Sequence, residues 1–192
     1  ETIFMASTYT GLGVQLMTTG EKAGTWGTLT NTNWNIMEQI SGGYTAQALS
    51  STPTTLSVSD GTAGATLAHR IIEFTGTIGE NFVVTIPLDV QTFYIIKNGT
   101  SGGYTVQFKY VSGSGSSVTW STTDKGTKLI YAAADDATNP NIVDTGFLSN
   151  VVDDTSPQLG GNLDIKSYGL TSSTNIMNST ISGTGKTMIL GF

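Results

Sequence analysis

Two pairs of adjacent aspartates are the residues of this sequence with the clearest capacity for chemistry. They are Asp135–Asp136 and Asp153–Asp154, with Asp144 and Asp164 nearby. Carboxylates at a fixed separation can hydrolyse glycosides, and clusters of carboxylates can bind Ca²⁺. The second pair, however, precedes the Thr-Ser-Pro run at 155–157, which is typical of a turn. We therefore favour charged turns over a catalytic or calcium-binding role.

The remaining reactive residue types, histidine and cysteine, and the one phosphate-loop-like segment do not form a recognisable catalytic set. His69 is the only histidine and the chain has no cysteine, so His-based triads and zinc sites lack material. The segment SGTGKT at 182–187 is similar to a phosphate-binding loop, but that motif needs a glycine where Thr180 stands. The sequence therefore predicts no enzyme, no catalytic residues, no metal and no cofactor, with His69 at the surface or in packing.

Three tryptophans and two asparagine motifs could take part in sugar chemistry. Trp26, Trp34 and Trp120 could stack on sugar rings, but anchors of a core or an interface are the more frequent role of such residues. Trp120, beside a Gly/Ser loop, is the best candidate for an exception. Asn98-Gly99-Thr100 and Asn178-Ser179-Thr180 match glycosylation acceptors, although Asn98-Gly99 is better explained as a hairpin turn.

The composition restricts the class of partner. Charged residues make up 11% of the 192 residues, the net charge is −6, and Arg70 is the only arginine. Nucleic-acid binders need a basic footprint, which is missing here. No apolar run approaches the roughly 20 residues that span a bilayer, so we expect no membrane insertion. An export signal is not evident either. Many Thr and Val residues favour a mainly β fold.

The first part of the chain, 1–43, predicts an N-terminal arm with one short helix. Glycines interrupt its apolar positions up to residue 27, so these side chains need a partner surface, either the rest of the chain or another protein. Residues 28–43 give the best helix signal, with Thr30, Asn31 or Thr32 as N-cap and glycines as the stop. Trp34 is expected to anchor this helix.

The middle of the chain, 44–145, predicts a compact antiparallel domain, a β-sandwich or barrel-like fold. Short alternating segments are separated by turn signals about every ten residues. The runs FVVTI at 82–86 and FYIIK at 93–97 are continuously apolar, which indicates central strands. The expected strands are 54–59, 70–76, 82–86, 91–97, 104–111, 117–121, 127–134 and 141–145.

The last part, 146–192, predicts an extended segment that needs other copies of the chain, and the resemblance given below implies that it is the start of an extended fibre shaft. Its apolar residues are isolated and cannot form a core within one chain, whereas three copies around an axis could bury them. The expected shaft positions are Leu159, Leu163, Ile165, Leu170 and Ile176. We also expect the natural polypeptide to continue beyond Phe192.

Three segments carry a resemblance to a known family. The stretch MASTYTGLGVQLMTTGEKAGTWG with the NTNWNIMEQI helix after it, the pair FYIIKNGTSGGYTVQFK with KLIYAAAD, and DDTSPQLGGNLDIKSYGLTSSTN are similar to fibre-like structural proteins of tailed bacteriophages, especially phages of marine bacteria. The resemblance implies a homotrimeric tail fibre located in the virion. Its N-terminal part would dock on the tail or an adaptor, and a distal part would contact a host surface glycan. The implied docking residues are Tyr9, Leu12, Val14, Leu16, Trp26 and Trp34.

Other functions stay open at this point. A head fibre or capsid decoration protein could use the same kind of arm. A carbohydrate-binding tailspike module would need exposed aromatic rings beside amide groups, and hydrolysis would need two carboxylates in a cleft. A bacterial surface adhesin is a further possibility.

Overall fold

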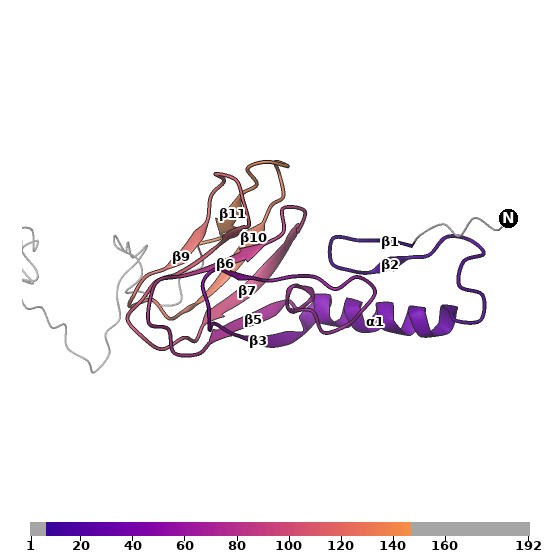
Figure 1. Ribbon diagram of the computed structural model, residues 1–192, viewed down its shortest axis with the longest axis horizontal. Helices are drawn as coiled ribbons and strands as arrows, with labels where there is room; N and C mark the ends of the chain where they lie inside the picture. Colours follow the sequence, from indigo (N-terminus) through magenta and orange to yellow (C-terminus); the bar gives the residue numbers. More distant parts are fainter. Residues whose placement is uncertain (1–6, 147–192) are drawn as a thin grey trace, which may run out of the picture. The chain divides into compact units, whose positions relative to one another are not determined.

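The computed structural model describes residues 7–146, and these contain two packed β-sheets, one α-helix and a small hairpin (Figure 1). The predicted shaft positions, Asp153–Asp154 and the SGTGKT segment lie outside the described residues. One sheet has five strands, in the order β11-β10-β7-β5-β3, and the other has four, in the order β4-β6-β8-β9. The five strands are β3 (Tyr44–Ala48), β5 (Ile71–Thr75), β7 (Thr92–Asn98), β10 (Thr127–Ala132) and β11 (Ile142–Asp144). The four are β4 (Thr54–Thr55), β6 (Phe82–Ile86), β8 (Val106–Tyr110) and β9 (Val118–Trp120).

The chain alternates between the two sheets from β3 to β8. Each sheet therefore receives every second strand, and β3, β5 and β7 are parallel neighbours, as are β4, β6 and β8. Parallel neighbours need a long connection, and here that connection contains a strand of the opposite sheet. Only β8–β9, β10–β11 and β7–β10 pair antiparallel within the sandwich.

This topology corrects part of the predicted fold. A mainly β chain with one helix is confirmed, and so are the central positions of β6 and β7. The purely antiparallel arrangement is wrong because the sheets are mixed, and no barrel closes. Turn residues alone do not reveal whether the chain returns to the same sheet or crosses to the other one.

Asn98-Gly99 illustrates the difference, because it is not a hairpin turn. It leads from β7 in one sheet toward β8 in the other, and the Asn98 side chain is fully buried. Its Oδ1 accepts hydrogen bonds from the backbone N–H and the hydroxyl of Thr100, at 3.2 and 2.7 Å. The Asn98 amide therefore holds a turn that crosses between sheets, which a glycosylated asparagine at the surface could not do.

The core lies between the sheets and is built on aromatic rings. Phe74 meets Trp120 edge-on, with ring centroids 5.9 Å apart, and lies 6.3 Å from the ring of Phe108. Trp120 is fully buried and its indole N–H donates to the Gly126 carbonyl at 3.0 Å. The possibility that Trp120 stacks on a sugar is therefore excluded, because its ring is a central part of the core.

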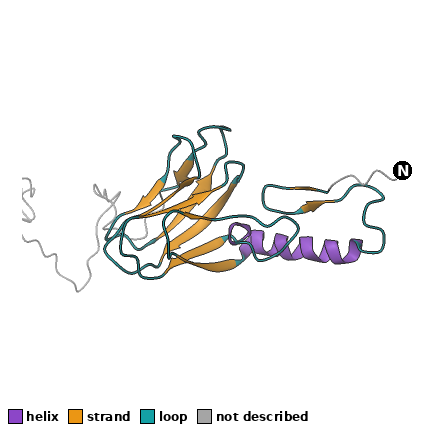
Figure 2. Cartoon of the chain, viewed as in Figure 1, coloured by secondary structure: helices purple, strands orange, loops and turns teal. Residues whose placement is uncertain are grey.

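Helix α1 (Trp26–Gly42) precedes the first strand of the sandwich (Figure 2). It starts two residues before the predicted helix, so the expected caps Thr30, Asn31 and Thr32 lie inside it, and its actual N-cap, Thr25, makes no side-chain cap bond. It ends where expected: the Gly43 N–H donates to the Gln39 carbonyl at 2.9 Å. A Cβ at Gly43 would lie 2.7 Å from the Gln39 Cα, so only glycine fits this close turn.

The predicted role of Trp34 in this helix is wrong. The Trp34 side chain is exposed, and Ile36 is the one residue of the helix that is completely buried. A helix places residues two apart on different faces, so the buried stripe passes through Ile36 and leaves Trp34 outside. The helix is thus held by an aliphatic side chain, and its tryptophans are free for other contacts.

The first aspartate pair, Asp135–Asp136, lies in the loop from β10 to β11 and accepts hydrogen bonds from residues of that loop. Hydrogen bonds from the side-chain amide and then the backbone N–H of Asn141 lower the pKa of the Asp135 carboxyl. Backbone N–H groups of Asn139 and Thr138 lower the pKa of Asp136 in the same way. Both carboxylates therefore act as acceptors that close the loop, which agrees with the charged-turn interpretation.

We predict that Tyr94→Phe destabilises the sandwich. The buried Tyr94 hydroxyl donates to the Leu67 carbonyl at 2.9 Å, and the substitution leaves that carbonyl without its partner. The expected loss in the free energy of unfolding is about 1–3 kcal/mol, measured by urea denaturation. Tyr104→Phe, at an exposed ring, is the matched control and should change stability by less than about 0.5 kcal/mol. Equal stabilities of the two variants would contradict the proposed role of this bond.

We also predict that the Asp135–Asn141 loop loses stability in acid. A carboxyl whose folded pKa is lowered stabilises the fold above its unfolded pKa, near the usual value of 3.8, and this contribution disappears as pH falls through the folded pKa. The double variant Asp135→Asn/Asp136→Asn should therefore have a lower urea midpoint than the parent at pH 7. The difference should shrink steadily below pH 4 (roughly the unfolded pKa). A difference that is independent of pH would contradict this account.

Candidate assembly surface

The hairpin β1–β2 is fastened to helix α1 by one asparagine. Strands β1 (Thr8–Tyr9) and β2 (Gln15–Leu16) pair antiparallel. From the helix, Asn33 accepts the backbone N–H of Gln15 at 3.0 Å and donates its amide to the Gln15 carbonyl at 2.9 Å. The amide thus satisfies both backbone groups of one strand residue, in place of a third strand.

The other end of the hairpin contacts the sandwich. Gly13 accepts the N–H of Gly61 at 2.8 Å, and a Cβ on Gly13 would lie 2.7 Å from the Ser59 carbonyl oxygen. Gly13 also has a φ of 81°, a conformation that favours glycine. Beside it, Leu12 packs on the hydrophobic core. The hairpin is therefore part of the same compact unit as the sheets and not a free arm.

The six residues implied for docking divide into two groups. Leu12 and Val14 are half-buried, and Leu12 is already occupied by the chain's own core. The other four are exposed: Tyr9 to 38%, Leu16 to 50%, Trp26 to 64% and Trp34 to 67% of their surfaces. The apolar arm thus meets its need for a partner surface partly within the chain, and four large side chains remain in solvent.

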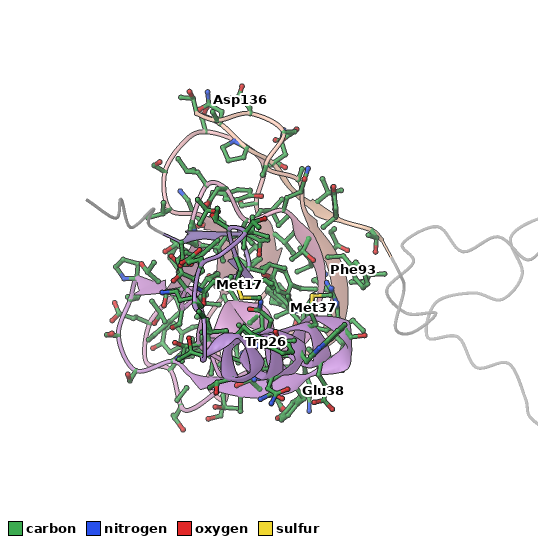
Figure 3. The ribbon with its side chains drawn as sticks, turned by 90° about the vertical axis from the view of Figure 1, so that its right-hand side faces the viewer. Met17, Trp26, Met37, Glu38, Phe93 and Asp136 are labelled. Atoms are coloured by element: carbon green, nitrogen blue, oxygen red, sulfur yellow. The ribbon has the colours of Figure 1, made fainter. Side chains whose placement is uncertain are left out.

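Two methionines extend this exposed group, although they were not among the expected docking residues. Met37 is 45% exposed and Met17 is 40% exposed. Met37 follows Trp26 by eleven residues, or about three helical turns, so both lie on one flank of the helix. That spacing is the signal in the sequence that could have identified Met37. Figure 3 shows Met17 on one side of the helix and Glu38 on the other.

We name the exposed apolar side chains of the hairpin and helix the hairpin–helix patch. Methionine and tryptophan suit a contact surface, because the thioether adapts its shape and the indole brings a large rigid area. Singly exposed apolar residues are common, and the hairpin register places Tyr9 and Leu16 on opposite faces of the hairpin; what distinguishes this group is that six large apolar side chains are exposed on two adjacent elements. The patch comprises Tyr9, Leu16, Met17, Trp26, Trp34 and Met37.

A groove of about 440 Å³ adjoins the patch, between the hairpin turn, the helix and the start of β7. Leu12 and Val14 of the arm and Met37 and Ile40 of the helix form its apolar walls. Asp89 and Gln91 form its polar end. A side chain of a partner could enter here beside Met37. The groove is lined by Thr10, Gly11, Leu12, Val14, Met37, Ile40, Asp89 and Gln91.

A second depression, of about 670 Å³, lies at the end of the helix, and polar side chains make up about half of its lining. Tyr44 gives it one aromatic ring, and the His69 Nδ1–H is directed to the Ala65 carbonyl at 2.8 Å. His69 is half-buried and bound by the backbone, which agrees with the packing role expected for it. The polar side chains around this depression are Asn35, Glu38, Gln39, Ser41 and His69.

The described residues gather no group of three or more histidines and carboxylates that could hold a metal ion. Residues 7–146 also contain no helix that is long and apolar enough to cross a membrane.

Comparison of the chain with protein-family models gave no match, and neither the curated proteins nor the solved structures gave one.

We predict that Asn33→Ala releases the hairpin from the helix without unfolding the sandwich. The variant loses both bonds to Gln15, each worth about 0.5–1.5 kcal/mol. Hydrogen exchange at the Gln15 amide should therefore accelerate roughly tenfold or more, since 1.4 kcal/mol is a factor of ten. Asn35→Ala, an exposed residue two positions away on the same helix, is the control and should leave this exchange unchanged. Unchanged exchange in Asn33→Ala would show that other contacts hold the hairpin.

Proposed function

We propose that this chain is the N-terminal portion of a homotrimeric tail fibre of a tailed bacteriophage, a structural virion protein that anchors the fibre. The hairpin–helix patch would dock on the tail or an adaptor protein. The segment after residue 146 would continue into the shaft, and a distal part would meet the host surface glycan. The proposal rests on the resemblance of three sequence segments and on the physical character of the patch.

The single observation that carries the docking role is the exposure of Trp26 and Trp34. Each leaves about two thirds of its surface in water. Tryptophan is the residue most enriched at energetic hot spots of interfaces. The clamp of Asn33 and the contact of Gly13 hold the patch in place beforehand, which reduces the entropy lost on docking.

The low content of charged residues also supports a structural role for the chain. Only 11% of its residues are charged, so its surface contacts depend on apolar area, hydroxyls and amides rather than on ion pairs. Contacts of this kind are little affected by ionic strength, because salt screens charges and not apolar burial.

We predict that Trp26→Ser/Trp34→Ser abolishes docking and leaves folding intact. In phage that carry the double variant, purified virions should contain at least about thirtyfold less of this chain by quantitative mass spectrometry, since two lost hot spots cost 2 kcal/mol or more. The isolated full chain should keep its urea midpoint, because both side chains are exposed. Tyr104→Ser, an exposed ring of the sandwich outside the patch, is the matched control and should incorporate normally.

The same preparation tests the wider proposal. Light scattering should give a mass about three times 20.1 kDa for the full chain, and immunogold microscopy should place it on tails. Gold on heads would support the head-fibre or decoration alternative instead. A monomeric mass together with absence from virions would refute a fibre role altogether.

A further inference from the structure

The groove beside Met37 ends in a carboxylate that nothing nearby neutralises. Asp89 is exposed, and the ion pairs among residues 7–146 all use other carboxylates. Next to it in the lining, the side-chain amide of Gln91 donates to the Ala133 carbonyl at 2.7 Å, which leaves its Oε1 as an acceptor. The polar end of the groove is therefore rich in hydrogen-bond acceptors and carries a negative charge.

The walls of the groove have the opposite character. Leu12, Val14, Met37 and Ile40 line it, and the described residues place no cation among its lining side chains. A lysine or arginine combines the two properties that the groove requires, since each has a flexible hydrocarbon stem and a cationic head. The stem can lie along the apolar walls while the head donates hydrogen bonds to the polar end.

The position of Asp89 is fixed before any partner arrives. The next residue, Val90, is fully buried, and its carbonyl accepts the Tyr110 hydroxyl at 2.8 Å. On the other side the hairpin turn lies directly against the loop, because a Cβ on Gly11 would lie 3.2 Å from the Asp89 carbonyl oxygen. The carboxylate is thus held at a set place relative to the hairpin, which reduces the entropy lost on binding.

Charge identifies the occupant of the groove. A wholly apolar side chain would cover Asp89 without pairing it, and an unpaired buried charge is costly. A second copy of the chain is disfavoured, because the net charge of each copy is −6. A basic side chain on a different protein meets neither obstacle. Inside the groove its ion pair with Asp89 would also be screened less by salt than a pair at the surface.

We propose that the groove receives a lysine or arginine of the protein on which this chain docks, with its cationic head at Asp89 and its stem against Leu12 and Met37. The inference deepens the proposed function and rests on it, because the groove adjoins the hairpin–helix patch. Its volume of about 440 Å³ is at the low end for pockets that hold a small molecule, which suits one long side chain. The patch then supplies apolar area, and Asp89 supplies selectivity for the partner.

A side-chain analogue tests the groove without the partner. We would titrate the full chain with n-butylguanidinium and with N-butylurea, which has nearly the same shape and no charge. The methyl resonance of Met37 reports binding, since this side chain lines the groove. The charged compound should bind at least about tenfold more tightly, because hydrogen bonds between charged groups are stronger than those of a neutral donor.

Asp89→Asn should remove this preference, so that the two compounds bind equally within about twofold. Glu80→Gln is the matched control, because it neutralises another exposed carboxylate that does not line the groove, and it should keep the tenfold preference. Both variants should keep the urea midpoint of the parent, since both positions are exposed. If Asp89→Asn does not fold, the selectivity of the unchanged chain still decides.

Charge reversal tests the groove in the virion. Asp89→Lys places like charges together, so purified virions should contain at least about tenfold less of the chain by quantitative mass spectrometry. Glu80→Lys should incorporate normally. Second-site revertants of Asp89→Lys should replace a basic residue of another virion protein with an acidic one, which would identify the partner as well.

The outcomes separate this inference from the proposed docking. Equal binding of the two compounds to the unchanged chain, or normal incorporation of Asp89→Lys, would overturn the inference. Docking would still stand in either case if Trp26→Ser/Trp34→Ser removes the chain from virions. Normal incorporation of that double variant would instead refute the docking role of the patch, on which the inference rests. A tenfold preference that Asp89→Asn removes, together with loss of Asp89→Lys from virions, would support it.

Discussion

The core shared by two interleaved sheets is the constraint on which the rest of this structure depends. Because the chain crosses to the opposite sheet at every step from β3 to β8, neither sheet can complete its pairing before the other exists. The edge-on contact of Phe74 with Trp120 joins β5 of one sheet to β9 of the other. Folding should consequently be cooperative, with many contacts between residues distant in sequence, a topology that folds slowly.

That core also determines where the apolar residues that are not buried between the sheets can lie. The inner faces take up the bulky aromatic residues, and the space between two sheets of this size is limited to one layer of side chains. The remaining apolar residues must lie on the helix, the hairpin or an outer face. Asn33 and Gly13 then become important for a reason unrelated to the core, because they hold the exposed hairpin–helix patch rigidly on it.

The sequence predicted the elements better than their connections. Alternation and turn residues located eight strands of the sandwich, and β6 was placed to the residue. It missed β3 and the short strands of the hairpin, whose residues alternate too briefly or too weakly to be recognised. The prediction also named the wrong anchor of the helix, Trp34 instead of Ile36, because it assumed that the largest apolar side chain would be the buried one. Crossing turns such as Asn98-Gly99 use the same residues as hairpins, so topology needs the pairing partners that only the folded chain provides.

The sequence was equally limited in predicting which surfaces are exposed. A periodic pattern reveals which residues share a face, but not whether that face is the inner or the outer one when both are apolar. Along β7, Tyr94 and Ile96 are buried, while Phe93 and Ile95, which alternate with them, lie on the outer side of the five-stranded sheet. Continuously apolar strands normally indicate burial on both sides. In β7 the described residues bury Tyr94 and Ile96 on one side, while Phe93 on the other side is 46% exposed. The run FYIIK is therefore apolar on a face that this part of the chain leaves partly in solvent.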